Sequence, residues 1–137
     1  MPIVSTRGRY ALRAMIDIAE HNTGKYIILK DIAKRQEISL KYLESILPEL
    51  TKAGFLHGLR GKGGGYKLTR APETYTVGSI LKLVEGNFSP VACLESAPNK
   101  CPRAENCPTL PMWQKFQASI SDFFEDISLA ELCHKSS

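Results

Sequence analysis

Three cysteines lie in the last third of the chain, at Cys93, Cys101 and Cys107. Seven and five residues separate them, which is wider than the paired-cysteine spacing of zinc ribbons and zinc fingers. Soft thiolates on an irregular segment suit an iron-sulfur cluster, because a cluster is larger than one ion and tolerates wider ligand separations. These cysteines therefore predict an iron-sulfur centre.

Three thiolates leave one coordination position of such a centre to be filled. Cys133 is one candidate, although its place beside His134 near the end of the chain is typical of an ordinary tail cysteine. Glu95, Glu105, a group from a partner subunit, and an exogenous thiol or water are the other candidates. An open or weakly held position would suit a sensor, since the centre could be lost or attacked there.

Residues 38–68 have the pattern of a helix, a strand, a glycine-rich hairpin and a second strand. Ser39 can cap the helix, and Gly54 can end it. Apolar residues recur every three or four positions and predict one buried face, made of Leu40, Leu43, Ile46, Leu47 and Leu50. The other face is rich in hydrogen-bond donors and could reach base edges in a major groove; it carries Lys41, Tyr42, Ser45, Glu49 and Lys52.

The hairpin after this helix has the composition of a wing. Its predicted strands cover residues 55–60 and 66–68, and GKGGG forms the turn. A backbone without Cβ can approach a phosphate or enter a minor groove closely, so the turn and its cations are candidates for DNA contact. A nucleotide-binding P-loop is disfavoured, because no hydroxyl residue follows Lys62 and a strand comes next.

Further helices are expected on both sides of this motif. Ser5 or Thr6 can cap a first helix that ends near Asn22. Its first two turns carry three arginines that either contact phosphates or remain hydrated surface, namely Arg7, Arg9 and Arg13. Residues 30–36 predict a second short helix, so that residues 29–53 form a helix-turn-helix, and Thr76 can cap another helix over residues 77–86.

The last predicted helix covers residues 112–132. Large apolar residues recur along it at intervals of three and four, at Trp113, Phe116, Ile120, Phe123 and Ile127. Such a stripe either folds back onto its own domain or forms a dimer seam. The seam is favoured, because an open stripe would be an unusually large exposed apolar patch.

Positive charge is concentrated in the first part of the chain. Residues 1–85 hold 14 Lys and Arg against 8 Asp and Glu, whereas residues 86–137 hold 4 against 6. The first part therefore suits a polyanion such as DNA. The 137 residues contain no run of about 18 apolar residues and no hydrophobic leader, which predicts a soluble cytoplasmic protein without a membrane partner. No Ser-His-Asp or paired-carboxylate arrangement can be placed, so neither an enzyme nor a small-molecule substrate is expected.

With these motifs the chain resembles the iron-sulfur cluster regulator (IscR-like) family of bacterial winged-helix repressors and activators. The resemblance covers nearly the whole chain, through STRGRYALRAM, ISLKYLESILPEL, LRGKGGGYKL, VGSILKLVEG, the three cysteines and a final helix ending in SLAEL. It implies a mainly α fold with a small β wing. Residues 1–86 would form the winged helix-turn-helix DNA-binding domain, residues 87–111 the cluster-binding loop, and residues 112–137 the dimerisation helix and tail.

The resemblance also implies roles for individual residues in a homodimer on a pseudo-palindromic operator of double-stranded DNA. The DNA-binding residues would be Ser39, Lys41, Tyr42, Glu44, Ser45, Arg60, Lys62, Gly63 and Gly64. The cluster ligands would be the three cysteines, and [2Fe-2S] is favoured over [4Fe-4S]. Leu110 stands where the cluster regulators carry a histidine, and Arg9 stands where nitric-oxide-sensing relatives carry a carboxylate. Iron, redox state and nitric oxide all remain open as signals.

Two other functions are consistent with parts of the pattern. One is a winged-helix regulator without a cluster, controlled by a protein partner, as among the cysteine-metabolism regulators that resemble this family. The other is an iron-sulfur electron carrier, in which the basic first part and the wing would have no role.

Overall fold

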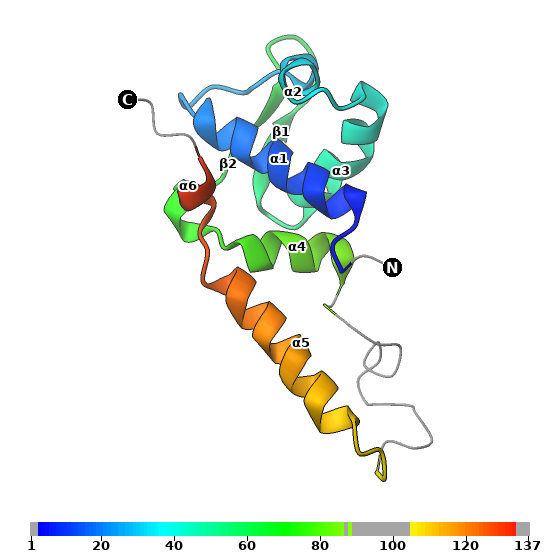
Figure 1. Cartoon of the computed structure of the whole chain (residues 1–137). Coiled ribbons are helices and arrows are strands. Elements are labelled where there is room, and N and C mark those ends of the chain that lie inside the picture. Colours follow the sequence, from blue (N-terminus) through cyan, green and yellow to red (C-terminus); the bar gives the residue numbers. More distant parts are fainter. Residues whose placement is uncertain (1–2, 87, 89–104, 134–137) are drawn as a thin grey trace.

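The structure is a computed structural model that describes residues 3–86, 88 and 105–133. Its elements follow one another from the blue N-terminus to the red C-terminus in Figure 1. They are α1 (Thr6–Glu20), α2 (Leu29–Gln36), α3 (Leu40–Lys52), β1 (Leu56–Leu59), β2 (Gly65–Leu68), the 3-10 turn η1 (Pro72–Thr74), α4 (Val77–Glu85), α5 (Leu110–Glu125) and α6 (Leu129–Leu132). This mainly helical fold with one small sheet confirms the predicted fold class.

The helix starts lie where the sequence places hydroxyl caps. Ser5 accepts a hydrogen bond from the Gly8 amide at the start of α1, and Ser39 accepts one from Tyr42 at the start of α3. Between α2 and α3 the chain turns at Glu37, which adopts a left-handed conformation with φ of 54°. This turn allows α3 to cross α2 as a helix-turn-helix.

One apolar core joins α1, α2, α3, the wing strands, α4 and α6. The side chains at its centre are completely buried, among them Met15, Ile18, Ile32, Leu43, Leu47 and Tyr75. The predicted buried face of α3 is confirmed for its four later members. It is wrong for Leu40, which is 37% exposed, because the first turn of α3 extends past the core together with Ser39 and Lys41.

The wing consists of β1, β2 and the turn at residues 60–64. The two strands are antiparallel, with Leu56 opposite Leu68 and Leu59 opposite Gly65. Ile27, just before α2, adds a bridge to Tyr66 through hydrogen bonds of 2.8 and 2.9 Å between the two backbones. The wing is therefore attached to the helix-turn-helix along one strand.

The C-terminal part contains two helices where the sequence predicted one. After Glu125 the chain leaves the α5 helix, and the Val77 amide donates to the Ile127 carbonyl at 2.8 Å. The Leu129 amide donates to the Tyr75 carbonyl at 2.9 Å, and Ser128 starts α6 with a capping box. The prediction of a continuous helix over residues 112–132 is wrong because these backbone bonds to the start of α4 interrupt it.

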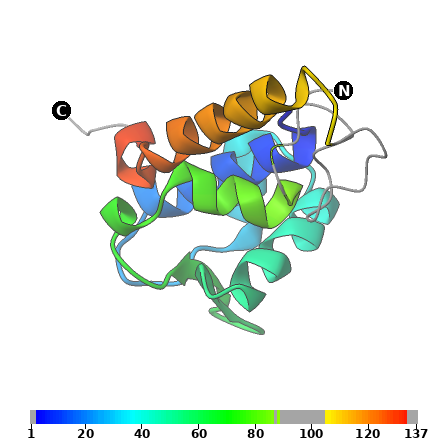
Figure 2. The same ribbon diagram turned by 90° about the horizontal axis from the view of Figure 1, so that it is seen from below.

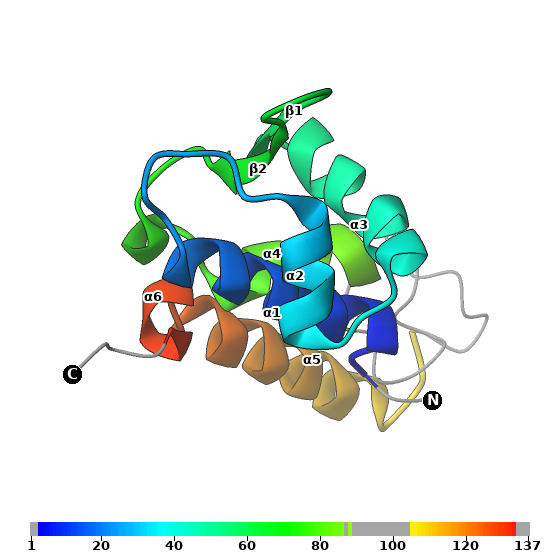
Figure 3. The same ribbon diagram turned by 90° about the horizontal axis from the view of Figure 1, so that it is seen from above.

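Figures 1 and 3 show the wing and α5 on opposite sides of the molecule, with α1 between them. Figure 2 shows α5 lying alongside α4 when the molecule is seen from below. A second small core lies where these two helices meet, formed by Val77, Leu81 and Phe88 with Ile120 and Phe124. Within the described residues, no helix is both long and apolar enough to span a bilayer.

Candidate nucleic-acid interface and cysteine segment

The N-terminal end of α3 presents four of the nine predicted DNA-binding residues to solvent. Lys41, Glu44 and Ser45 are exposed there, as is Ser39 at the cap. Helix N-termini and cationic side chains are the usual partners of phosphates and base edges, and Figure 3 shows α3 at the edge of the molecule. This end of α3 is the part of the helix that could enter a major groove.

Tyr42 lies differently from its neighbours in α3. Its side chain is half-buried, and its ring packs edge-on against Tyr10 of α1 with ring centroids 5.3 Å apart. Arg13 in turn stacks over the Tyr10 ring at 5.2 Å and donates to the Gln36 side chain at 3.3 Å. Tyr42 is thus partly a packing residue that joins α3 to α1.

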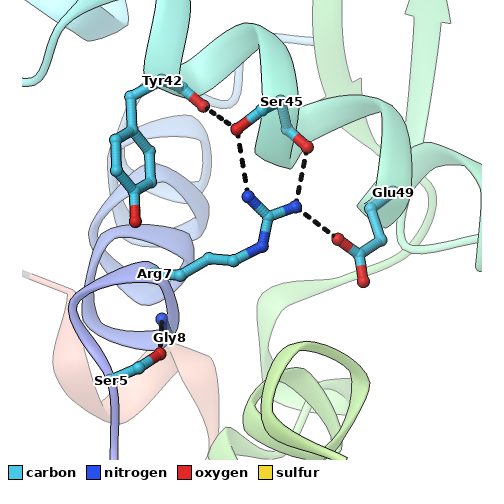
Figure 4. Close-up of polar contacts among 6 residues, drawn as sticks. All are labelled: Ser5, Arg7, Gly8, Tyr42, Ser45 and Glu49. Carbon is cyan, nitrogen blue, oxygen red and sulfur yellow. Dashed lines mark hydrogen bonds and ion pairs between the residues drawn. The ribbon is translucent and has the colours of Figure 1, made fainter.

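Arg7 bonds directly to α3, as Figure 4 shows. Its guanidinium donates to the Ser45 hydroxyl at 3.0 Å and to the Ser45 carbonyl at 2.8 Å. It also forms a 2.6 Å ion pair with Glu49, one helical turn further along α3. Of the three N-terminal arginines, Arg7 and Arg13 therefore bond to residues of other helices, whereas exposed Arg9 bonds Thr6 on its own helix at 3.1 Å.

A buried carboxylate fixes α2 against α1. Asp17 is 1% exposed and accepts hydrogen bonds from Arg35 at 2.7 and 3.0 Å and from Gln36 at 2.9 Å. The hydrogen bonds that Arg35 donates to Asp17 raise the pKa of Arg35, so this guanidinium stays charged. Because α2 precedes the turn into α3, this ion pair helps to set where α3 begins.

The wing carries its predicted cations at an exposed tip. Arg60 and Lys62 are exposed, and Gly63 has a φ of 77°. A Cβ at Gly64 would lie 2.2 Å from the Leu59 carbonyl oxygen, so the hairpin itself requires glycine there. The glycines predicted to permit close contact with DNA thus also have a role in folding.

Only the last of the three predicted cluster ligands falls within the described residues. Cys93 and Cys101 lie outside them, whereas Cys107 is half-buried with its sulfur 3.3 Å from the Thr109 hydroxyl. Leu110, the first residue of α5, is 8% exposed and apolar. Among the described side chains, no group of three or more His, Cys, Asp and Glu is arranged to hold a metal ion.

Cys133 lies at the opposite end of α5 from Cys107. Figure 1 shows α6 beyond the C-terminal end of α5, and the sixteen residues of α5 span about 24 Å. Burial raises the pKa of the Cys133 thiol, with Glu20 and Glu73 adding to the effect, and its sulfur donates to the Leu129 carbonyl at 3.4 Å. This placement agrees with the interpretation of Cys133 as a tail cysteine.

The long-range polar pairs were missed in the sequence. Glu85 at the end of α4 accepts a 3.0 Å hydrogen bond from the Ser5 amide at the start of α1, where a carboxylate interacts favourably with the helix dipole. A Cβ on Gly8 would lie 2.3 Å from the same Glu85 oxygen, so glycine makes room for it. Ser5 gave a local capping signal in the sequence, but no pattern there indicated that Glu85 would pair with it. The pairing of Asp17 with Arg35 and of Glu49 with Arg7 likewise had no sequence signal.

An exposed end of α3 beside a cationic wing is the arrangement of a winged helix-turn-helix DNA-binding protein. The model of the Rrf2 family, described as an iron-dependent transcriptional regulator, matches residues 4–135. The chain belongs to the Rrf2 family, which confirms the predicted resemblance and the prediction that the protein is not an enzyme.

Individual relatives agree with this membership. The transcriptional regulator IscR of Erwinia tasmaniensis is 38% identical over 94% of this chain and 77% of its own length. Among solved structures, CymR, described as the global cysteine regulator of B. subtilis, matches all of both chains with a TM-score of 0.78 and 31% identity. IscR of T. potens matches 94% of this chain and 84% of its own, with a TM-score of 0.73 and 35% identity.

Proposed function

We propose that the chain acts as a homodimer whose affinity for a pseudo-palindromic operator is modulated by an iron-sulfur cluster. The observation that carries this proposal is the set of three cysteines between the winged helix and α5, in a family described as iron-dependent. Two copies of α3 about 34 Å apart would enter successive major grooves. Lys41 and Glu44 would face base edges, and Arg60 and Lys62 would contact the backbone or the minor groove.

The donor set fits an iron-sulfur cluster, because thiolates are the ligands that soft iron centres prefer. Cys93, Cys101 and Cys107 would hold it. Leu110 offers no donor atom, which leaves the fourth position to Glu95, Glu105, the partner subunit or an exogenous ligand. A bound cluster would supply a group whose oxidation or loss changes the charge of the segment joining α4 to α5.

The apolar surface of α5 supports the homodimer. Phe116 and Phe123 are 44% and 62% exposed, and they line an open apolar groove together with Ile3 and Val4. A contiguous exposed patch of this kind is costly in water and is usually covered by a partner. The occupant that fits it is α5 of a second copy, since an isologous contact pairs the same stripe with itself.

A cluster-free regulator controlled by a protein partner is the second candidate. It is favoured by the similarity to CymR over all of both chains, since that protein is described as a cysteine regulator. Under this alternative the three cysteines would be thiols without inorganic sulfide.

Anaerobic purification, with iron and sulfide analysis and an absorption spectrum, separates the two candidates. The proposal predicts iron, sulfide and visible absorption in the native protein, and a change in operator affinity when the cluster is removed. Cys101→Ala should abolish that response, whereas Cys133→Ala, at the other end of α5, should retain it. A protein without iron and sulfide after reconstitution, with the same affinity in every state, would favour the second candidate.

A further inference from the structure

The hydroxyl of Ser45 is already used within the protein. It donates to the Tyr42 carbonyl at 2.6 Å and accepts from Arg7 at 3.0 Å. A hydroxyl has one hydrogen, and both acceptors of guanine in the major groove need a donor. Ser45 can donate to a base only by breaking its bond to Tyr42, which leaves one lone pair as its remaining free group. The resemblance nevertheless gives it the role of a base contact.

Arg7 holds α3 at two points on one face. Ser45 and Glu49 are four residues apart, so their side chains lie one above the other on the helix. The guanidinium bonds the hydroxyl and carbonyl of the first and the carboxylate of the second. A planar donor fork bound at two successive turns restricts rotation of α3 about its own axis.

We propose that Arg7, Ser45 and Glu49 form a bracket that fixes the rotation of α3 against α1, and that Ser45 is a positioning residue and not a base-reading one. The inference rests on the proposed function, in which the first turn of α3 enters the major groove. Base discrimination is then left to the exposed side chains of Lys41 and Glu44. Arg7 acts through α3 and makes no phosphate contact of its own, because its charge is paired with Glu49 at 2.6 Å.

Positioning and base reading predict different patterns of affinity. A lost base contact changes the preference at one base pair, since one good contact discriminates about five- to hundredfold. A lost positioning contact weakens binding to all duplexes by a similar factor. A lost phosphate contact lowers the slope of log affinity against log salt by about 0.9 for each contact.

The test uses the full-length protein and the duplex that the wild type selects from a random-sequence library. Affinities are measured for this duplex and all its single-base-pair variants, at several salt concentrations. Arg7→Ala should weaken binding about tenfold on every duplex, with base preferences and salt slope unchanged. Ser45→Ala should weaken binding about threefold, also uniformly, and the double variant should resemble Arg7→Ala alone because both changes remove one shared contact.

Arg9→Ala is the matched control, because it removes an exposed cation from the same turn of α1 without touching α3. Arg7→Ala should exceed it in uniform loss of affinity. Arg7→Lys should recover part of the loss, since an ammonium can pair with Glu49 but cannot form the fork. If Arg7→Ala unfolds, Glu49→Gln opens the same bracket from its solvent-facing end and should give the same uniform loss.

Two results would overturn the bracket. One is a change of base preference at a single position in Ser45→Ala, which would make Ser45 a base reader. The other is a reduced salt slope in Arg7→Ala but not in Arg9→Ala, which would make Arg7 a phosphate contact. Both differ from failure of the proposed function, in which the wild type itself would select no duplex.

Discussion

Helices α3 and α5 are both amphipathic, but they cover their apolar faces differently. In α3, the side chains of Leu43, Ile46 and Leu47 are completely buried in the core of their own chain. In α5, Ile120 and Phe124 pack against α4, while Phe116 and Phe123 point to solvent. The same periodicity therefore forms a closed core in one region and leaves part of an apolar stripe exposed in the other.

The largest expected effect on stability comes from truncating a buried side chain of α3. Leu47→Ala should lower the free energy of unfolding by about 2–5 kcal/mol, because it removes buried methyl groups and leaves a cavity. Chemical denaturation at two protein concentrations should give the same loss, since the contact lies within one chain. Leu40→Ala, on the exposed first turn of the same helix, is the control and should cost less than about 1 kcal/mol.

A charge placed on the exposed part of the apolar face of α5 should weaken association of the proposed dimer without changing the fold. Phe123→Glu should raise the dissociation constant of the dimer about a hundredfold, because two carboxylates would face one another across the apolar seam. Sedimentation at micromolar concentration should then show a monomer with an unchanged helical circular dichroism spectrum. A wild type that is already monomeric at high concentration would contradict the seam.

A smaller effect is expected where the wing joins the core. The Tyr75 hydroxyl donates to the Phe55 carbonyl at 2.8 Å and accepts from the Thr69 amide at 3.0 Å. Tyr75→Phe leaves both backbone groups unsatisfied beside a completely buried ring, which should cost about 1–3 kcal/mol of unfolding free energy. Equal stability of variant and wild type in urea would indicate that water replaces the hydroxyl.

The smallest expected effect concerns pH and Cys133. The pKa of this thiol is raised on folding, so the folded state favours the protonated form. The stability that the protonated thiol contributes is fully present below the pKa of the unfolded thiol. That contribution is lost as pH rises through the folded pKa. When pH rises from 7 to above about 8.5, the free energy of unfolding should therefore fall less for Cys133→Ser than for the wild type. Equal losses in the two proteins would contradict the raised pKa.

Local patterns predicted most of the winged helix. Ser5, Ser39 and Thr76 each cap the helix that follows, since a cap bonds an amide only three residues away. The helix break after Glu125 was missed although Ser128 and Glu131 form a capping box, which is a local signal for a new helix start. The backbone bonds from Ile127 and Leu129 to residues about fifty positions earlier have no such local signal.

The predicted DNA-binding residues differ in how far the structure exposes them. Lys41, Glu44, Arg60 and Lys62 are exposed as the sequence suggested. Tyr42 also has a packing role, because Tyr10 lies against it. That contact follows from how α1 crosses α3.

The sequence by itself determined where most helices and the wing occur, and which faces are apolar. Caps, turns and periodicity act over a few residues, so they are legible in the order of the chain. Only the tertiary structure decided that Arg7 meets Glu49 across 42 positions, that Asp17 anchors Arg35, and that the α5 stripe is half covered. Such pairings follow from how whole helices pack, because a surface finds its neighbour only once the chain has folded.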